Sequence, residues 1–312
     1  MRLRSIDVRG RSALAASLAV AGALVAGSAT VAGEQENPNI GDEVAGKAGG
    51  LRYSADSQAF NPANVGYATN DAGCGPPSWR LVGGGSAASG PSDDVQIASS
   101  RGLDYTDPDD RVDDGFLASG YGATGGAITS FSICRAGGGV KYVRVEVPDG
   151  SSGLRTGQAR CGGRRWHVSA GSTFIATSEA WTNSSHPIDG GDRDRKPDDG
   201  WRGRVFDTAG GPGGFVIYAI CLRGAALRYV KARPVALSDE EARTRIAKCR
   251  RKEHVVGGGA KLTGPINRGR LIATHPSDSG DAGSVPDDRW RAGAFNVSGL
   301  AKRLTAYAIC LK

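Results

Sequence analysis

Asp residues that recur at fixed positions in three loops are the groups best suited to bind a metal ion. Each loop begins at a hydroxyl residue (Ser100, Ser185 or Thr274), and Asp follows four, seven, thirteen and fourteen positions later. Ca²⁺ takes six to eight oxygen ligands, so carboxylates in such Gly- and Pro-rich loops could hold it. Asp also supports turns by accepting hydrogen bonds from nearby backbone amides, which is the commoner use of this pattern. The sequence therefore predicts either no cofactor or calcium. The candidate calcium ligands are Asp104, Asp107, Asp189, Asp192, Asp194, Asp198, Asp199, Asp278 and Asp281.

An aromatic residue follows each Asp pair at a distance of two positions: Phe116, Trp201 and Trp290. An aromatic face beside carboxylates could stack on a sugar ring while the carboxylates accept protons from its hydroxyl groups. Three such sites would give avidity for a polymeric glycan. The same spacing is typical of core aromatics at the start of a buried strand, so both interpretations stay open.

Two histidines, His186 and His275, share one repeat position before a Pro and are further candidate ligand-binding residues. The alternative is a structural or surface role, because the first copy has Arg101 there. A third, His254, stands five residues after a Cys, where the other copies have Trp. The chain has no G-x-S-x-G, H-E-x-x-H, phosphate-loop or dinucleotide-binding signature. The sequence therefore favours a non-enzymatic protein, with a secreted hydrolase that uses a site in one repeat copy as the alternative.

Six Cys residues reveal the elements that carry these loops. Their successive separations are 60, 27, 60, 28 and 61 residues, a regularity that indicates an internal repeat of 87 to 88 residues. A Gly triplet follows the first Cys of the first and third copies, and Ser169-Ala170-Gly171 takes its place in the second. The predicted units run over 51–134, 140–221 and 227–310.

Two disulfide patterns respect the repeat: one bond within each unit, or bonds across the junctions, with Cys74 meeting Cys310. Bonds within units are favoured because each unit is then closed independently, and a loop of this length contributes about 4 kcal/mol. Zinc is not indicated, since no pair of Cys has the C-x2-C spacing. The favoured bonds are Cys74–Cys134, Cys161–Cys221 and Cys249–Cys310.

Within a unit the pattern predicts β-strands. Residues 141–147 alternate, with β-branched side chains on one face, and Gly-rich connections separate neighbouring runs. We expect about five strands per unit and one short helix, which the capping box Ser238-x-x-Glu241 opens toward Lys248. The expected fold is all-β, with three tandem repeats. They either close around a pseudo-threefold axis, as in a β-prism, or form three small β-sandwich-like modules.

The amino terminus has the layout of a secretory signal peptide. Arg residues precede an apolar run over 13–27, and small residues lead to a cleavage position after Ala32. Residues 33–50 are expected to form a flexible leader, and no further segment is long enough to span a membrane. Export favours disulfide formation. The net charge of +7 comes from scattered basic residues without a nucleic-acid-binding motif, so nucleic acid is not an expected partner.

Two segments, Asp198-Asp199-Gly200-Trp201 and Tyr218-Ala219-Ile220-Cys221, resemble parts of the Cys-bounded β repeats of secreted actinobacterial proteins. The resemblance implies secretion and the repeat boundaries, and it carries no activity. From the residues themselves we expect a secreted, non-catalytic binding protein of the extracellular space or cell surface. A glycan or cell-envelope polymer is the expected partner.

Overall fold

The computed structural model contains only β-strands as regular elements in the residues that it describes. The described residues are 46–61, 66–90, 95–104, 112–122, 125–150, 152–175, 180–191, 194, 196–208, 214–264, 268–278 and 285–312. The predicted signal peptide and residues 33–45 of the predicted leader lie outside them. The all-β prediction is confirmed.

Each predicted unit contains six strand positions, which we number first to sixth, rather than the expected five. The first unit has β2 Leu51–Ala59, β3 Tyr67–Gly73, β4 Trp79–Ser89, β5 Gln96–Leu103, β6 Gly115–Tyr121 and β7 Ala127–Ala136, with β1 Gly46–Ala48 added beside β2. The second has β8 Val140–Val147, β9 Gly153–Arg160, β10 Trp166–Ile175, β11 Ala180–Ile188, β12 Gly200–Asp207 and β13 Phe215–Arg223. The third has β14 Leu227–Lys231 with β15 Val235–Leu237, then β16 Ala242–Lys248, β17 His254–Thr263, β18 Gly269–Ser277, β19 Arg289–Asn296 and β20 Lys302–Leu311.

The strands of each unit pair in the same order. The first, sixth and third strands form one antiparallel group: β2–β7–β4, β8–β13–β10 and β14–β20–β17. The second, fifth and fourth strands form another: β3–β6–β5, β9–β12–β11 and β16–β19–β18. One disulfide in each unit joins the two groups, and these are the predicted bonds Cys74–Cys134, Cys161–Cys221 and Cys249–Cys310. The disulfide prediction is therefore confirmed.

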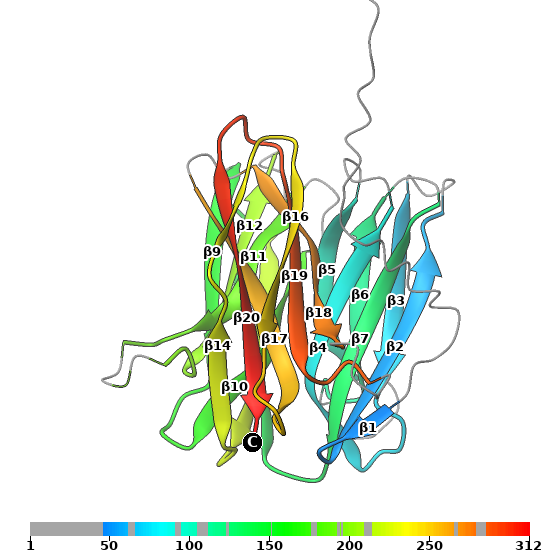
Figure 1. Ribbon diagram of the computed structural model, residues 1–312, viewed down its shortest axis with the longest axis vertical. Helices are drawn as coiled ribbons and strands as arrows, with labels where there is room; N and C mark the ends of the chain where they lie inside the picture. Colours follow the sequence, from blue (N-terminus) through cyan, green and yellow to red (C-terminus); the bar gives the residue numbers. More distant parts are fainter. Residues whose placement is uncertain are drawn as a thin grey trace, which may run out of the picture. The chain divides into compact units, whose positions relative to one another are not determined.

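The sheets continue from one unit into the next. Strand β4 of the first unit pairs with β18 of the third, and β17 of the third pairs with β11 of the second (Figure 1). The first and second units meet at β5 and β10, where a side chain takes the place of backbone pairing. The Ser99 hydroxyl donates to the carbonyl of Ile175 (2.6 Å) and accepts from its amide (2.8 Å). Each unit therefore contacts both others, which fits the closed arrangement and not separate modules.

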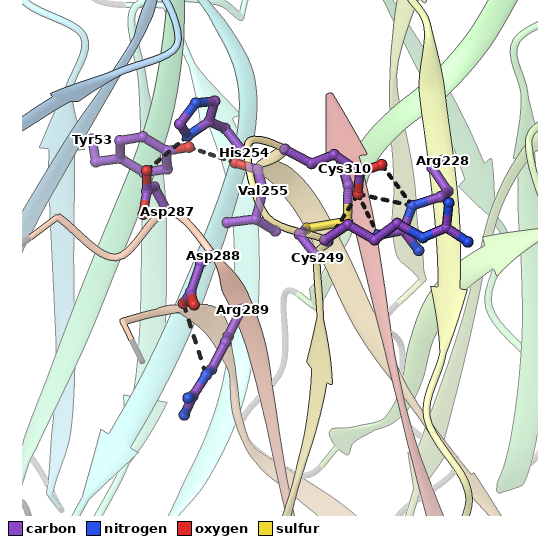
Figure 2. Close-up of a disulfide and its surroundings, with 11 residues drawn as sticks. Tyr53, Arg228, Cys249, His254, Val255, Asp287, Asp288, Arg289 and Cys310 are labelled. Atoms are coloured by element: carbon purple, nitrogen blue, oxygen red, sulfur yellow. Dashed lines mark hydrogen bonds and ion pairs between the residues drawn. A yellow bond between two sulfur atoms is a disulfide. The ribbon is translucent and has the colours of Figure 1, made fainter. Parts of the chain in front are cut away.

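Tyrosines at the same position of the three first strands tie the units together. The Tyr53 hydroxyl donates to the carbonyl of Val255 at 2.8 Å, as Figure 2 shows beside the third disulfide. Tyr142 donates to the carbonyl of Leu81 at 2.6 Å, and Tyr229 to that of Val168 at 2.7 Å. Each acceptor belongs to a different unit from its donor. One buried core accordingly includes residues of all three units.

In the second unit, the counterpart of the Gly triplet begins at Ala170, one residue later than the sequence-based alignment with Ser169. Each third strand carries a β-bulge, and the residue after it pairs with an Ile of the sixth strand. Ala170-Gly171-Ser172 therefore corresponds to the Gly triplets at 83–85 and 257–259. The middle Gly is kept in all copies because a Cβ there would overlap the ring of Phe116, Trp201 or Trp290.

The predicted helix after Ser238 is wrong, since residues 242–248 form β16 and pair with β19. Half of the capping box is nevertheless present, because the Ser238 amide donates to the Glu241 carboxylate at 2.6 Å. Long-range pairing of β16 overrides this local signal.

Candidate functional site

The three aromatic residues beside the acidic loops are buried, so their predicted role as a sugar-stacking face is wrong. Phe116, Trp201 and Trp290 are at most 1% exposed. The indole N–H of Trp201 donates to the Ser185 hydroxyl at 2.8 Å, and that of Trp290 donates to the Thr274 hydroxyl at 3.0 Å. In the second and third loops, the hydroxyl residue that opens the loop thus satisfies the buried Trp. The core interpretation of these aromatics applies.

The first Asp of each pair is bound to an Arg or His side chain at the start of the third strand. Arg80 contacts Asp113 at 2.7 Å, His167 contacts Asp198 at 3.0 Å, and His254 contacts Asp287 at 2.7 Å. The ladders place Arg80, His167 and His254 at the same position, so the earlier alignment of His254 with Trp was off by one. Figure 2 shows the third of these pairs.

The backbone of the Asp pairs is equally engaged. The carbonyl of each second Asp accepts the amide of the first Cys in its unit, as in Cys161 to Asp199 at 2.9 Å. The carbonyl of each first Asp accepts an amide of the third strand, as in Val168 to Asp198 at 2.8 Å. Burial raises the pKa of Asp198, and the neighbouring His167 opposes that rise. These contacts fit the turn-forming interpretation of the pairs.

The remaining described carboxylates do not converge on one point. Asp189 accepts the amide of Gly191 at 2.7 Å, the Asp199 carboxylate accepts the amide of Gly190, and Asp194 pairs with Lys196. Among the described residues no three His, Cys, Asp or Glu side chains are grouped to hold a metal ion. Asp104 and Asp278 are also described, whereas the candidates Asp107, Asp192 and Asp281 lie outside the described residues.

His186 and His275 lie where the sheets cross from one unit to the next. The His186 ring stacks on Tyr307 with centroids 5.4 Å apart, and the His275 ring stacks on Phe131 at 4.7 Å. In both, Nδ1 donates to the carbonyl of the following Pro, which leaves Nε2 as the acceptor of a neutral ring. Burial lowers both pKa values to about 4, so both rings are neutral at pH 7.

His186 belongs to a row of residues that crosses six strands of the second and third units. The ladders pair Arg202 with both Gln158 and His186, and Tyr307 with both Gly259 and Lys231. His186 and Gly259 meet at the junction of β11 with β17, one position beyond the pair that Ser185 forms with Ala260. Because paired residues point to the same face of a sheet, these side chains line one surface. The row is Gln158, Arg202, His186, Gly259, Tyr307 and Lys231.

A pocket of about 410 Å³ opens on this row. Its walls come from β11, β12, β14, β17 and β20, and Lys261 from the next row completes its cationic rim with Arg202 and Lys231. Burial lowers the pKa of Lys261, and the nearby positive charges of Lys231, Arg202 and Arg204 lower it further.

No carboxylate forms an ion pair with these four cations in the described part of the chain. The Gln158 amide lies beside Arg202 and, with its oxygen turned toward the guanidinium, accepts from it at 2.8 Å. The one acidic residue in the lining, Asp189, bonds to the backbone. The Nε2 atom of His186 is buried and has no hydrogen-bond partner among the described residues. Crowded positive charges and an unused acceptor are suited to an anion that also carries a hydroxyl group.

His186 was predicted from the sequence as a ligand-binding residue, but the residues around it were not. They lie on five strands of two units and belong to no local motif. The available signal was the difference between copies, because the ladders align Lys231 and Lys261 with Ala55 and Ala87 of the first unit.

The described residues include no helix with the length and apolar character needed to cross a bilayer. The three disulfides fit an oxidising, extracellular environment. Comparison with protein-family models finds no match, and comparison with curated proteins finds none either.

Proposed function

We propose that this chain is a secreted, non-catalytic binding protein that holds an anionic group of an extracellular glycan or cell-envelope polymer. The observation that carries the proposal is the pocket between the second and third units, where Arg202, Lys231 and Lys261 have no acidic partner among the described residues. An anion bound there gains charge-assisted hydrogen bonds in a partly desolvated site.

Secretion is supported by the signal-like amino terminus and by the three disulfides. A polymeric ligand is supported by the continuity of the row, which crosses six strands rather than ending in a closed cavity. A polymer can occupy such a surface with several linked units.

The proposal is tested by binding of the disulfide-bonded protein to defined acidic and neutral polysaccharides, measured by isothermal titration calorimetry at two salt concentrations. We expect acidic polymers to bind, with an affinity that falls as salt rises because charges are screened. The variant Lys231→Ala/Lys261→Ala should lose at least tenfold in affinity.

The matched control is Arg164→Ala/Arg251→Ala, which removes the same charge from exposed positions away from the pocket. Equal loss in both double variants would show that only net charge matters and would overturn the pocket as the site. Binding of neutral polymers alone, or release of new sugar ends during incubation, would overturn the proposed ligand class or the absence of catalysis.

A further inference from the structure

A pair of aromatic rings lies on the same sheet face as the cationic pocket. Along β12 the residues Arg202, Arg204 and Phe206 are partly exposed, while those between them are buried. Phe206 therefore shares its face with Arg202, and four residues of strand separate them by about 13 Å. Trp181 of β11 pairs with Phe206, and their rings stack with centroids 5.1 Å apart.

Trp181 is particular to the second unit. The ladders place Gln96 and Arg270 at the same position of the other two units. Its indole N–H has no hydrogen-bond partner among the described residues, unlike those of Trp201 and Trp290. That nitrogen is itself buried, so a ligand would meet the partly exposed faces of the two rings rather than the indole N–H.

We propose that Trp181 and Phe206 form a second subsite, for a sugar ring, and that the ligand is consequently an acidic oligosaccharide. This inference rests on the proposed function, since the first subsite is the cationic pocket. The apolar C–H face of a sugar packs on an aromatic ring, and the stacked pair of Trp181 and Phe206 offers such a surface. The separation of the subsites exceeds one sugar ring, so linked units are needed to occupy both.

The test compares three probes by titration calorimetry: galacturonic acid, tetragalacturonate and inorganic polyphosphate of matched charge. Wild-type protein should bind tetragalacturonate at least tenfold more tightly than either of the other probes. Trp181→Ala should remove that advantage over galacturonic acid while leaving galacturonic acid binding unchanged. Trp181→Phe, which keeps a ring on Phe206, should retain most of it.

A matched control is Trp166→Ala, which removes another partly exposed indole from the same unit. Melting temperatures of all variants establish that they are folded. If Trp181→Ala binds tetragalacturonate as tightly as the wild-type protein does, the second subsite is overturned. It is also overturned if the wild-type protein binds polyphosphate as tightly as tetragalacturonate. In those cases loss of binding in Lys231→Ala/Lys261→Ala would still support the proposed function. If no acidic saccharide binds wild-type protein, both proposals fail.

Discussion

Two junctions between units use the same backbone pairing but differ in chemistry. At the junction of β17 with β11, the row carries Lys231, Tyr307, His186 and Arg202. At the junction of β4 with β18, the aligned residues are Ala55, Phe131, His275 and Arg291. Both junctions keep the His that stacks on an aromatic ring, so this contact belongs to the scaffold. Lys231 is present only in the first of these rows, where the other has Ala55. The shared His therefore stabilises the junction, whereas Lys231 belongs to the part of the surface that can bind an anion.

Adding a methyl group to the Gly at each junction gives the largest expected effect. A Cβ on Gly259 would overlap the carbonyl of Ser185, and one on Gly85 would overlap that of Thr274. Either Gly→Ala change should lower the free energy of unfolding by about 3 kcal/mol or more, because backbone atoms must move. Urea unfolding measures the loss. At the third junction, which has no ladder, Ser172→Ala should change stability by less than about 1 kcal/mol. Similar losses in all three would show that the ladders do not set the requirement for Gly.

Acid should weaken both junctions through their histidines. The pKa of each folded His is about 4, against about 6.5 when unfolded, so the unfolded chain takes up protons first as pH falls. Stability that is complete above pH 6.5 should be lost toward pH 4, by about 3 kcal/mol per His. His186→Gln and His275→Gln should each flatten the pH dependence of urea unfolding relative to wild type. A bound anion should raise the pKa of His186 alone, so ligand should protect one junction and not the other.

Adding the two Lys residues to the junction of β4 with β18 should create a second binding site there. Ala55→Lys/Ala87→Lys gives the first junction the charges of the second. With Arg291 already present, we expect a weak second anion site, and titration with galacturonic acid should show the stoichiometry rise from one to two. An affinity about tenfold below the natural pocket, or about 1.4 kcal/mol, is expected because Phe131 and the aligned Gly293 replace Tyr307 and Arg204. No second site would mean that the Lys pair is insufficient.

The hydrogen bonds from Tyr53, Tyr142 and Tyr229 to carbonyls of other units, which we call the tyrosine clamps, should contribute small and similar effects. Tyr53→Phe and Tyr229→Phe each remove one hydrogen bond to a carbonyl of another unit. Each should lower the free energy of unfolding by about 1 to 2 kcal/mol, since a buried acceptor loses its donor. Tyr229→Phe should leave the affinity for the anion unchanged although the ring lines the pocket, because the Tyr229 hydroxyl donates to the carbonyl of Val168 and not into the pocket. A large affinity loss would instead place that hydroxyl in the site.

The repeat, the disulfides and the strand class followed from the sequence because they leave periodic signals. The Cys spacing left two symmetric disulfide patterns open, and the structure contains the favoured one, with one bond within each unit. The exact alignment of the three copies could not be predicted from the sequence. The bulges after Leu81, Val168 and Val255 shift the third strands by one residue, which changes the counterparts of the Gly triplet and of His254. The sequence left the burial of Trp201 undecided, because the hydroxyl group that satisfies its indole N–H lies 16 residues earlier in the chain. The pocket could not be read from local spacing, since its rim combines residues of two units.

The Tyr53 clamp reaches across 202 residues, from the first strand of the first unit to the third unit. A chain that emerges amino terminus first therefore presents its first unit long before the acceptor of that clamp exists. Contacts of such sequence separation make folding slow, since the chain entropy must be lost before they form. The third unit, which is synthesised last, then completes the bonding of the first. A chain truncated before Val255 accordingly leaves the Tyr53 hydroxyl without its acceptor in the third unit.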